Sequence, residues 1–436
     1  MISGDTIAAI ATAPGRGGVA VVRVSGSEAF GIGERLTGCV PAVGQAVFSR
    51  FSSLSRDSSP AEKTIDEGLL LAFKSPHSYT GEDVVEFQCH GGAVTPRRVL
   101  EACLAAGARL AHRGEFTQRA FLNGKIDYAQ AESVLDLIDA KTARAADAAL
   151  EGLSGRRRRE CRALYESALD LSTRLEHALD IDEGELPVGF ADELRVASCE
   201  LRVKIEESIR KAAEGRLLRS GALVVLAGPP NAGKSSLLNA LLEENRAIVS
   251  ETPGTTRDSI EAWLDLDGWP IRLVDTAGLR KAKDEVEGEG VRRAEELLSK
   301  ADLVLWLGDP SSVFRLPSSV LRLHAKSDLG KGEGLNVSAK TGEGLEELKR
   351  AIIAKLEEKV AASDSGDAPE GDVAAYQEAL AVLDGGRETR DARREEDLVL
   401  MANAVRAVAE RLGAAIGATY SSDMLDNLFS RFCVGK

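Results

Sequence analysis

The eight-residue stretch 228–235, Gly-Pro-Pro-Asn-Ala-Gly-Lys-Ser, constrains the fold more than any other part of this sequence. The apolar residues 222–227 before it predict a buried strand, and the leucine-rich residues 236–242 after it predict a helix. Strand, glycine loop and helix are the setting of a phosphate-binding loop, in which backbone N–H groups curl around an anion. Lys234 supplies a charge for the outer phosphates, and the Ser235 hydroxyl can hold Mg²⁺. The complete pattern favours phosphate binding over a plain glycine turn.

Length and charge limit the rest of the chain. The 436 residues are too many for one hydrophobic core, so we expect two or three domains. The net charge is −14, so a contact with nucleic acid requires a local basic patch. The six cysteines include no CxxC pair, which disfavours a zinc site or a disulfide framework and favours a reducing compartment. The sequence shows no signal peptide and no run of eighteen apolar residues, so we expect a cytoplasmic protein without a membrane span.

The sequence pattern of the first 120 or so residues predicts an α+β domain. Short apolar runs separated by turn residues predict strands. The polar residues 52–63 predict a loose connection. The expected strands are residues 7–11, 19–24, 68–73 and 84–90.

The pattern becomes helical from about residue 127 to 218, and again from 373 to 430. Between these parts, residues 220–358 alternate strands with helices, which predicts a parallel sheet, and residues 361–372 have the composition of a linker. Helix, α/β module and helix suggest that the module is inserted into one helical domain built from both flanks. Residues that recur at helical spacing in the first flank are Leu135, Ile138 and Thr142, and Leu164, Ala168, Leu171 and Leu175.

Further nucleotide motifs follow the phosphate-binding loop in the expected order. Thr256, in residues 254–258, could complete the Mg²⁺ shell, and Asp275 ends an apolar run where a carboxylate can hold Mg²⁺ through water. The Asp328 carboxylate suits the paired N–H donors of guanine, which adenine lacks. Each motif alone is weak, but the ordered set predicts GTP binding and hydrolysis. The predicted GTP-binding residues are Asn231, Ala232, Gly233, Lys234, Ser235, Ser236, Ser250, Glu251, Thr252, Pro253, Gly254, Thr255, Thr256, Asp275, Thr276, Ala277, Gly278, Lys326, Asp328, Ser338, Ala339 and Lys340.

One position departs from the usual base-reading motif, Asn-Lys-Xaa-Asp. Ala325 replaces the asparagine, which normally bonds the base and ties its loop to the phosphate-binding loop. We expect binding to weaken by about 0.5–1.5 kcal/mol, the net contribution of one hydrogen bond. The preference for guanine should survive through Asp328.

Three blocks of sequence resemble the MnmE (also called TrmE) family of tRNA-modifying GTPases over nearly the whole chain. They are residues 5–26, the GTPase module with Thr-Thr-Arg-Asp after its phosphate-binding loop, and the terminal residues 426–436, Asp-Asn-Leu-Phe-Ser-Arg-Phe-Cys-Val-Gly-Lys. Other small GTPases share only the second block. The last block is highly specific to the family.

This resemblance implies a multidomain α/β architecture. The expected parts are an N-terminal α+β folate-binding and dimerisation domain at 1–120, a helical domain from 121–218 and 359–436, and an inserted P-loop GTPase domain at 219–358. It also implies a homodimer that works with an MnmG-like flavoprotein in a heterotetramer or larger assembly. Together they would install a carboxymethylaminomethyl or aminomethyl group at C5 of the wobble uridine of certain tRNAs. A 5-formyl- or methylene-tetrahydrofolate would supply the one-carbon unit.

The resemblance also assigns roles to residues outside the phosphate-binding loop. Arg23, Glu86, Lys125 and Lys436 match folate-contacting positions. Arginine and lysine suit the glutamate tail of a folate, and a glutamate suits the donors of a pterin, although each residue alone also fits an ordinary surface charge. Cys433 matches a catalytic cysteine, with a small buried apolar residue as the alternative.

In the GTPase module, the family pattern implies a potassium-dependent switch. Ser235 and Thr256 would hold Mg²⁺, and Glu287 would orient the attacking water. K⁺ would stand where an arginine finger neutralises charge in other GTPases. Further departures from the family are Pro229 and a short stretch between Trp306 and Asp328. The expected K⁺ ligands are Asn231, Ser250, Thr252 and Thr255.

Two questions stay open at the level of sequence. Residues 156–159 are four consecutive arginines, which fit a solvated helix face or a contact with the tRNA backbone. The whole protein could also be a GTP-dependent switch for RNA or ribosome assembly, without modification chemistry. That alternative leaves the first 120 residues and the terminal block without a purpose.

Overall fold

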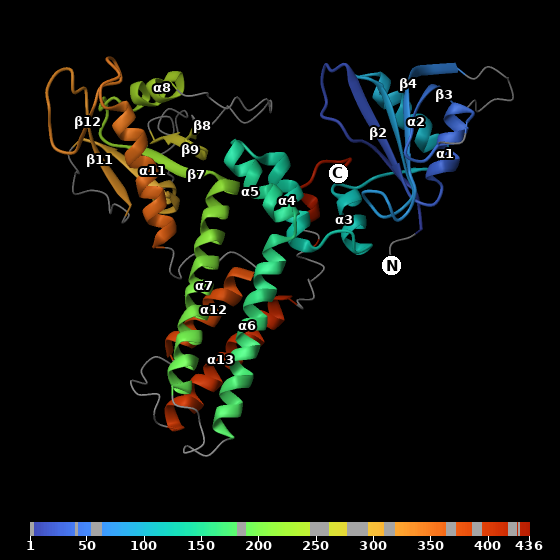
Figure 1. Cartoon of the computed structure of the whole chain (residues 1–436). Coiled ribbons are helices and arrows are strands. Elements are labelled where there is room, and N and C mark those ends of the chain that lie inside the picture. The colour runs from blue at the N-terminus through green and yellow to red at the C-terminus, as the bar shows by residue number, and fades with distance from the viewer. Residues whose placement is uncertain are drawn as a thin grey trace. The chain divides into compact units, whose positions relative to one another are not determined.

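A computed structural model describes residues 4–39, 42–53, 63–180, 189–244, 261–276, 295–308, 319–362, 372–385, 395–416, 425 and 428–436 (Figure 1). The chain divides into two compact units, which are described separately. The first comprises Met1–Leu135 and Thr419–Lys436, and the second comprises Asp136–Ala418. Among the described residues, no helix has the length and apolar character needed to cross a bilayer.

The first unit is built on a six-stranded sheet in the order β3-β4-β5-β2-β1-β6. Its strand pairs are antiparallel except β1 with β6, which is parallel. Helices α1 (Ala29–Thr37) and α2 (Thr95–Ala105) place Ile32, Leu36 and Val99 in the core beneath the sheet. The strands are β1 (Ile7–Ile10), β2 (Val19–Ser25), β3 (Ala46–Ser53), β4 (Lys63–Phe73), β5 (Val84–His90) and β6 (Arg109–Leu110).

The strands predicted at 7–11, 19–24 and 84–90 are confirmed, and the one predicted at 68–73 is the second half of β4. The sequence did not reveal β3, the first half of β4, or β6. In β3, an edge strand, only Ser49 and Phe51 are buried, so its apolar periodicity is weak. A two-residue strand such as β6 carries no periodic signal at all.

The C-terminal tail packs within the first unit, beside α3 (Glu115–Leu122) and α4 (Tyr128–Asp139). Leu428, Phe429 and Phe432 form an apolar cluster with Ala131 and Leu135 of α4. The phenylalanine rings of Phe429 and Phe432 lie 6.1 Å apart. These aromatic contacts anchor the tail by burying apolar surface, which removes it from water.

The helical part of the second unit is a bundle in which segments from both ends of the unit lie side by side (Figure 1). Leu164, Ala168, Leu171 and Leu175 are buried in α6, which confirms their predicted helical spacing. They share one core with residues of the C-terminal helices, so both flanks of the α/β part contribute to one hydrophobic core. The helices are α5 (Ala143–Leu153), α6 (Arg156–Leu179), α7 (Phe190–Ser220), α12 (Asp372–Gly385) and α13 (Glu395–Ile416).

The position of Thr142 corrects a prediction. Thr142 does not continue the helix that contains Leu135 and Ile138, because α4 ends at Asp139. It caps the next helix, α5, where its Oγ1 accepts a 3.2 Å hydrogen bond from the Ala145 N–H. Threonine is favoured at such a position because its side chain satisfies an N–H that the helix leaves unpaired.

The α/β part of the second unit has a six-stranded sheet in the order β12-β11-β10-β7-β9-β8. All pairs are parallel except β8 with β9. The prediction of a parallel sheet is therefore wrong for β8. Asp267 and Gly268 join these two strands with φ of 48° and 86°, as a tight hairpin turn requires. The strands are β7 (Ala222–Ala227), β8 (Glu261–Leu266), β9 (Trp269–Asp275), β10 (Leu303–Leu307), β11 (Val320–Ala325) and β12 (Leu335–Val337), with helices α8 (Lys234–Glu244) and α11 (Leu345–Ala361).

The hairpin of β8 and β9 is attached to the helices of the same unit. Thr142 Oγ1 donates a 2.7 Å hydrogen bond to the Gly268 carbonyl oxygen. The Arg144 guanidinium stacks 4.2 Å from the centre of the Trp269 ring and forms a 2.6 Å ion pair with Glu214 of α7. The α/β part thus touches the helical bundle through specific polar and aromatic contacts.

Candidate nucleotide and folate sites

The phosphate-binding loop lies between β7 and α8, as predicted. Gly228, Asn231 and Gly233 have φ of 142°, 62° and 97°, so the chain repeatedly enters the region that glycine favours. A Cβ at Gly228 would collide with the carbonyl oxygen of Leu307, which makes glycine obligatory there. The loop therefore has the backbone freedom that a cradle of N–H groups requires.

Lys234 is nearly buried, with 6% of its surface exposed. Its ammonium group donates to the carbonyl oxygens of Gly228 at 3.0 Å and Pro229 at 2.8 Å. These contacts hold a positive charge over the loop itself. Anionic phosphate oxygens are stronger acceptors than carbonyl groups, so this position suits the lysine of a phosphate-binding site.

Ser235 and Asp275 bring two oxygen groups together at the end of the sheet. Ser235 Oγ donates a 2.8 Å hydrogen bond to Asp275 Oδ2, and Asp275 is fully buried. Beside them, Thr276 Oγ1 donates to the Leu226 carbonyl oxygen at 2.9 Å, which holds the end of β9 against β7. A hydroxyl and a buried carboxylate are ligand types that Mg²⁺ prefers, so the residues present fit that ion.

The predicted base-reading residues form a second polar corner of the same module. Ser338 is fully buried, and its Oγ donates a 2.8 Å hydrogen bond to Asp328 Oδ1. Ser327 N–H donates to the Val337 carbonyl oxygen at 3.2 Å, which ties the two loops together. Of the neighbouring residues, Ala339 is half-buried, and Lys340 is exposed like Ser236 of α8.

At Ala325 the structure shows how the loops stay connected without the usual asparagine. The Ala325 Cβ lies 3.7 Å from the place that a Cβ on Gly233 would take, so this position faces the phosphate-binding loop. Lys326 makes a direct connection instead: its Nζ donates a 3.2 Å hydrogen bond to the Asn231 carbonyl oxygen. Lys326 itself has φ of 63°. The tie between the loops is therefore made by a lysine side chain.

Several predicted residues lie outside the described part of the chain. They are Ser250, Glu251, Thr252, Pro253, Gly254, Thr255, Thr256, Ala277, Gly278 and Glu287.

A second group of predicted residues gathers in the first unit. Arg23 on β2 and Glu86 on β5 are directly opposite in the sheet, and Arg23 Nε donates to Glu86 Oε1 at 2.7 Å. The Arg23 guanidinium also lies 5.6 Å from the ring centres of Tyr79 and Phe116. Burial raises the pKa of Tyr79, whose hydroxyl shares a 2.8 Å hydrogen bond with Thr117. This site combines a charge pair with two aromatic rings.

The last residue of the chain reaches the same group. Burial lowers the pKa of Lys436, and the nearby positive charge of Arg23 lowers it further. Gly435 has φ of 106°, and a Cβ there would collide with the Ile10 carbonyl oxygen, so the tail lies directly on β1. Arg113 Nε donates to the Phe432 carbonyl oxygen at 3.1 Å. The charged groups of Arg23 and Lys436 thus lie close to each other, and both residues are half-buried. An anionic ligand bound there would offset their mutual repulsion.

Lys125 and Cys433 complete the predicted residues of this unit. Lys125 Nζ donates a 2.9 Å hydrogen bond to the Pro76 carbonyl oxygen, in the loop that also carries Tyr79. Cys433 is exposed, so the alternative of a buried packing residue is wrong. Its backbone carbonyl oxygen accepts hydrogen bonds from the N–H groups of Gly114 at 3.4 Å and Lys436 at 3.3 Å.

The sequence did not reveal a buried charge network beside this group. Arg119 is 1% exposed and forms ion pairs with Asp5 at 2.8 Å, Glu82 at 3.1 Å and Glu115 at 3.0 Å. Burial alone would raise the pKa of Glu115, but hydrogen bonds from Arg109, the His112 N–H and Arg119 lower it below its usual range. The only sequence signal was the spacing of Glu115 and Arg119, four residues apart on a helix.

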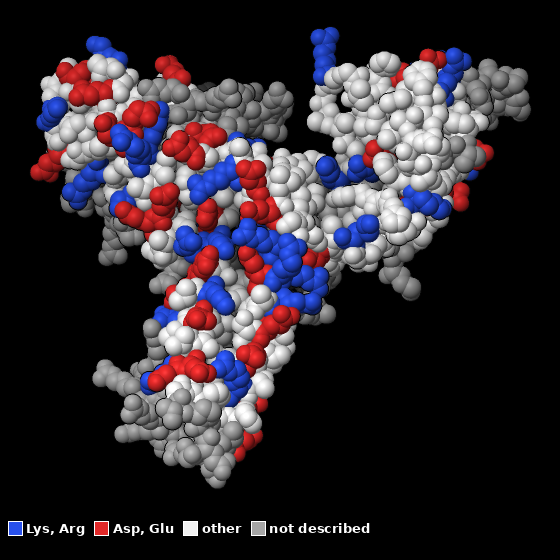
Figure 2. Space-filling view, in the orientation of Figure 1, with Lys and Arg blue, Asp and Glu red and all other residues white. Residues whose placement is uncertain are grey.

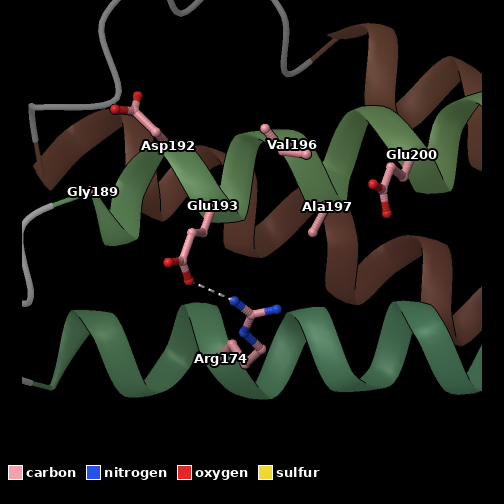
Figure 3. A pocket seen from close by; sticks show the side chains of 7 residues that line it. All are labelled: Arg174, Gly189, Asp192, Glu193, Val196, Ala197 and Glu200. Carbon is pink, nitrogen blue, oxygen red and sulfur yellow. Dashed lines mark ion pairs between the residues drawn. The ribbon is translucent and has the colours of Figure 1, made fainter.

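A hollow of about 430 Å³ lies between α6 and the start of α7 in the second unit (Figure 3). Asp192, Glu193 and Glu200 line it, and Arg174 lies 3.6 Å from Glu193. Three carboxylates against one guanidinium give this hollow a negative charge, which disfavours a nucleotide or a folate tail.

Comparison with known proteins identifies relatives over the whole chain. The family described as GTP-binding protein TrmE N-terminus matches residues 6–125, and the MnmE helical domain matches residues 128–433. The tRNA modification GTPase MnmE of Symbiobacterium thermophilum is 42% identical, covering 99% of this chain and 99% of its own. The protein of the same name from Nitrosomonas europaea is 40% identical, covering 100% of both chains. The solved G domain of the T. maritima FeoB iron transporter is 28% identical over 31% of this chain and 98% of its own, with a TM-score of 0.23.

Proposed function

The chain belongs to the MnmE family of tRNA modification GTPases and is a GTP hydrolase of tRNA modification; from this premise we propose a fuller activity. K⁺ accelerates its GTP hydrolysis. With an MnmG-like flavoprotein, it installs a carboxymethylaminomethyl or aminomethyl group at C5 of the wobble uridine. The observation that carries the proposal is the gathering of Arg23, Glu86 and Lys436 in the unit that lacks the nucleotide motifs.

In the GTPase module, the described residues have separate tasks. Lys234 holds the outer phosphates, because its charge already lies over the loop. Ser235 and Asp275 would hold Mg²⁺, and the bound ion would offset the negative charge of the phosphates. Asp328 accepts the paired N–H groups of guanine while Ser338 orients its carboxylate.

The remaining residues of this site follow from the family pattern. Asn231 helps to hold K⁺ together with Ser250, Thr252 and Thr255, and Thr256 joins Ser235 at Mg²⁺. Glu287 orients the attacking water. Asn231 is exposed on the phosphate-binding loop with its backbone at φ of 62°, so its side chain is available to a ligand of that loop. Bound K⁺ supplies the positive charge that an arginine finger supplies elsewhere.

The first unit binds the tetrahydrofolate that carries the one-carbon unit. Lys436 and Arg23 attract the anionic tail, because two cations share this half-buried place. Glu86 accepts hydrogen bonds from the pterin, and the rings of Tyr79 and Phe116 offer apolar faces beside it. Lys125 contributes from the neighbouring loop. Cys433, exposed at the tail, acts in the modification chemistry.

Assembly follows the family as well. The chain forms a homodimer through its N-terminal domain, so that two GTPase modules meet to complete the K⁺-dependent site. The flavoprotein joins this dimer in a heterotetramer or a larger complex. Six cysteines without a CxxC pair suit a reducing compartment, so we place the reaction in the cytoplasm.

Nucleoside analysis of tRNA from a strain lacking this protein tests the proposal. We expect the modified wobble uridine to disappear and to return when the wild-type chain is restored. A chain carrying Arg23→Ala should fail to restore it, although its GTP hydrolysis stays near wild type. Normal modification in the deletion strain would overturn the proposal and favour a GTP-dependent RNA or ribosome-assembly switch.

A further inference from the structure

We propose that the phosphates of tRNA bind a basic surface where α6 begins beside α7, an inference that rests on the proposed function in tRNA modification. Figure 2 shows Lys and Arg side chains gathered over the start of α6 and the adjoining part of α7. We call this the α6–α7 basic surface. It consists of Arg156, Arg157, Arg158, Arg159, Arg162, Arg210 and Lys211.

Two contacts show that both helices contribute to one surface. Arg157 Nη2 lies 3.8 Å from the place that a Cβ on Gly215 of α7 would take. Lys211 Nζ of α7 lies 3.8 Å from Glu160 Oε1 of α6. The start of α6 and residues 211–215 of α7 therefore lie side by side. Among the basic residues of this surface, Arg158, Arg159, Arg162, Arg210 and Lys211 are exposed.

The charges at the start of α6 oppose what the helix itself favours. Its first turn contains four arginines and no acidic residue. The N-terminus of a helix carries partial positive charge, so cations destabilise it and carboxylates stabilise it. Arg158 and Arg162 stand four residues apart on the same helix face, where like charges repel. A ligand of opposite charge would remove both penalties.

Among the described residues, three glutamates pair with members of this surface. Glu151 and Glu160 both pair with Arg156, at 2.7 Å and 2.8 Å. Glu207 pairs with Lys211 at 3.1 Å. Within the part of the chain that the structure describes, the seven basic side chains of this surface thus outnumber the three carboxylates paired with it.

The arrangement favours an extended polyanion over a small anion. The arginines from 156 to 162 rise about 9 Å along the helix axis, which exceeds the spacing of successive phosphates on one strand. Arginine pairs with phosphate through two parallel N–H groups, which suits it to a nucleic-acid backbone. Because the whole chain has a net charge of −14, most of its surface repels RNA, and a local basic surface decides where RNA binds.

The test measures binding of a tRNA transcript to the full chain over a series of KCl concentrations. We expect Arg158→Ala with Arg162→Ala to weaken binding about tenfold at low salt. The slope of the logarithm of the association constant against the logarithm of the salt concentration should become shallower by about 1–2. Each lost phosphate contact reduces the magnitude of this slope by about 0.7–0.9. GTP hydrolysis should stay at the wild-type rate, because both residues lie outside the nucleotide site.

The matched control removes two exposed basic residues elsewhere in the same unit, with Lys204→Ala and Arg350→Ala. It changes the net charge equally and should leave the slope unchanged. The conservative pair Arg158→Lys with Arg162→Lys should keep the wild-type slope. This result would show that the positive charge of the two side chains, and not their packing, accounts for the salt dependence of binding. Circular dichroism and thermal unfolding of each variant show whether its fold is intact.

Unchanged binding and slope in the alanine pair would overturn the α6–α7 basic surface but leave the proposed function standing. If the control pair weakens tRNA binding as much as the alanine pair does, the inference is overturned as well. The net charge of the whole chain would then explain the weaker binding. Normal tRNA binding with lost modification would assign the surface to an acidic protein partner instead. A wild-type chain that binds no tRNA would overturn the inference, and nucleoside analysis would then decide the proposed function separately.

Discussion

The hydrogen bond from Ser338 Oγ to Asp328 Oδ1, 2.8 Å long, connects the two loops that we propose to read guanine. Ser338 is fully buried, and its Oγ also accepts a 3.3 Å hydrogen bond from the Thr341 N–H. The carboxylate of Asp328 is thus held by a residue that is itself fixed. This geometry leads to a test of base recognition.

Asp328→Asn should weaken GTP binding by about 1.5–3 kcal/mol, the usual contribution of a hydrogen bond to a charged group. The amide donates where guanine also donates, so the variant should accept xanthosine triphosphate, which offers an acceptor there. Calorimetry with both nucleotides measures the exchange. Glu333→Gln, an exposed change near the same loop, serves as the control. If GTP binds Asp328→Asn as well as wild type, Asp328 does not read the base.

Ala325→Asn should tighten GTP binding by about 0.5–1.5 kcal/mol, because it restores the hydrogen bonds of the usual motif. The structure supports this direction, since Ala325 already faces Gly233 in the phosphate-binding loop. A longer polar side chain would reach that loop alongside the Lys326 contact to Asn231. Weaker binding by calorimetry would mean that the lysine contact has replaced the asparagine fully and that the new side chain disturbs it.

K⁺ should accelerate GTP hydrolysis, and Na⁺ at matched ionic strength and saturating GTP should not. The reason is the exposed position of Asn231 on the phosphate-binding loop, where we propose that its side chain helps to hold K⁺. Asn231→Ala should reduce the response to K⁺ while leaving the slow basal rate. Equal rates of hydrolysis in the two salts would contradict the proposed K⁺ site.

Features that depend on neighbours in sequence could be predicted, because their physical cause is local. The phosphate-binding loop was recognisable from its glycines and lysine, and the four buried residues of α6 from their spacing. The antiparallel strand β8 was missed although Asp267 and Gly268 form the turn that such a hairpin favours, because its strands carry mixed polar and apolar residues.

Features that depend on distant residues could not be predicted. Arg119 looked like any surface arginine, yet Asp5 and Glu82 pair with it from 114 and 37 positions away in the sequence. The placement of Lys436 beside Arg23 likewise depends on how the tail crosses β1, which no local pattern encodes. Such contacts decide the character of the proposed folate site and come only from the fold.

Lys436→Met should weaken tetrahydrofolate binding roughly tenfold to hundredfold, as expected for a lost charged contact. The lowered pKa of Lys436 adds a dependence on pH. Only the protonated amine attracts an anion, so wild-type affinity should fall as pH rises through this lowered pKa, below the usual range of lysine. The affinity of the Lys436→Met variant should not fall over the same pH range. Identical profiles for the two proteins would show that Lys436 does not contact the ligand.

Cys433→Ser should leave GTP hydrolysis near wild type while tRNA modification drops severely. Cys433 is exposed, and its described hydrogen bonds to Gly114 and Lys436 use the backbone carbonyl oxygen, so replacing sulfur by oxygen should not disturb the tail. GTP turnover and modified-uridine content are measured side by side for each variant. Gly435→Ala provides the comparison, because its Cβ would collide with Ile10 and displace the tail as a whole.

Comparison of the two tail variants therefore separates a chemical role of the Cys433 thiol from a structural role of the tail. Gly435→Ala should lose both tetrahydrofolate binding and modification, whereas Cys433→Ser should keep tetrahydrofolate binding and lose only modification. Full modification by Cys433→Ser would show that the thiol has no chemical role. Loss of hydrolysis together with a lower unfolding temperature would instead make Cys433 a residue of the fold, despite its exposed position, and would refute a catalytic site at the tail.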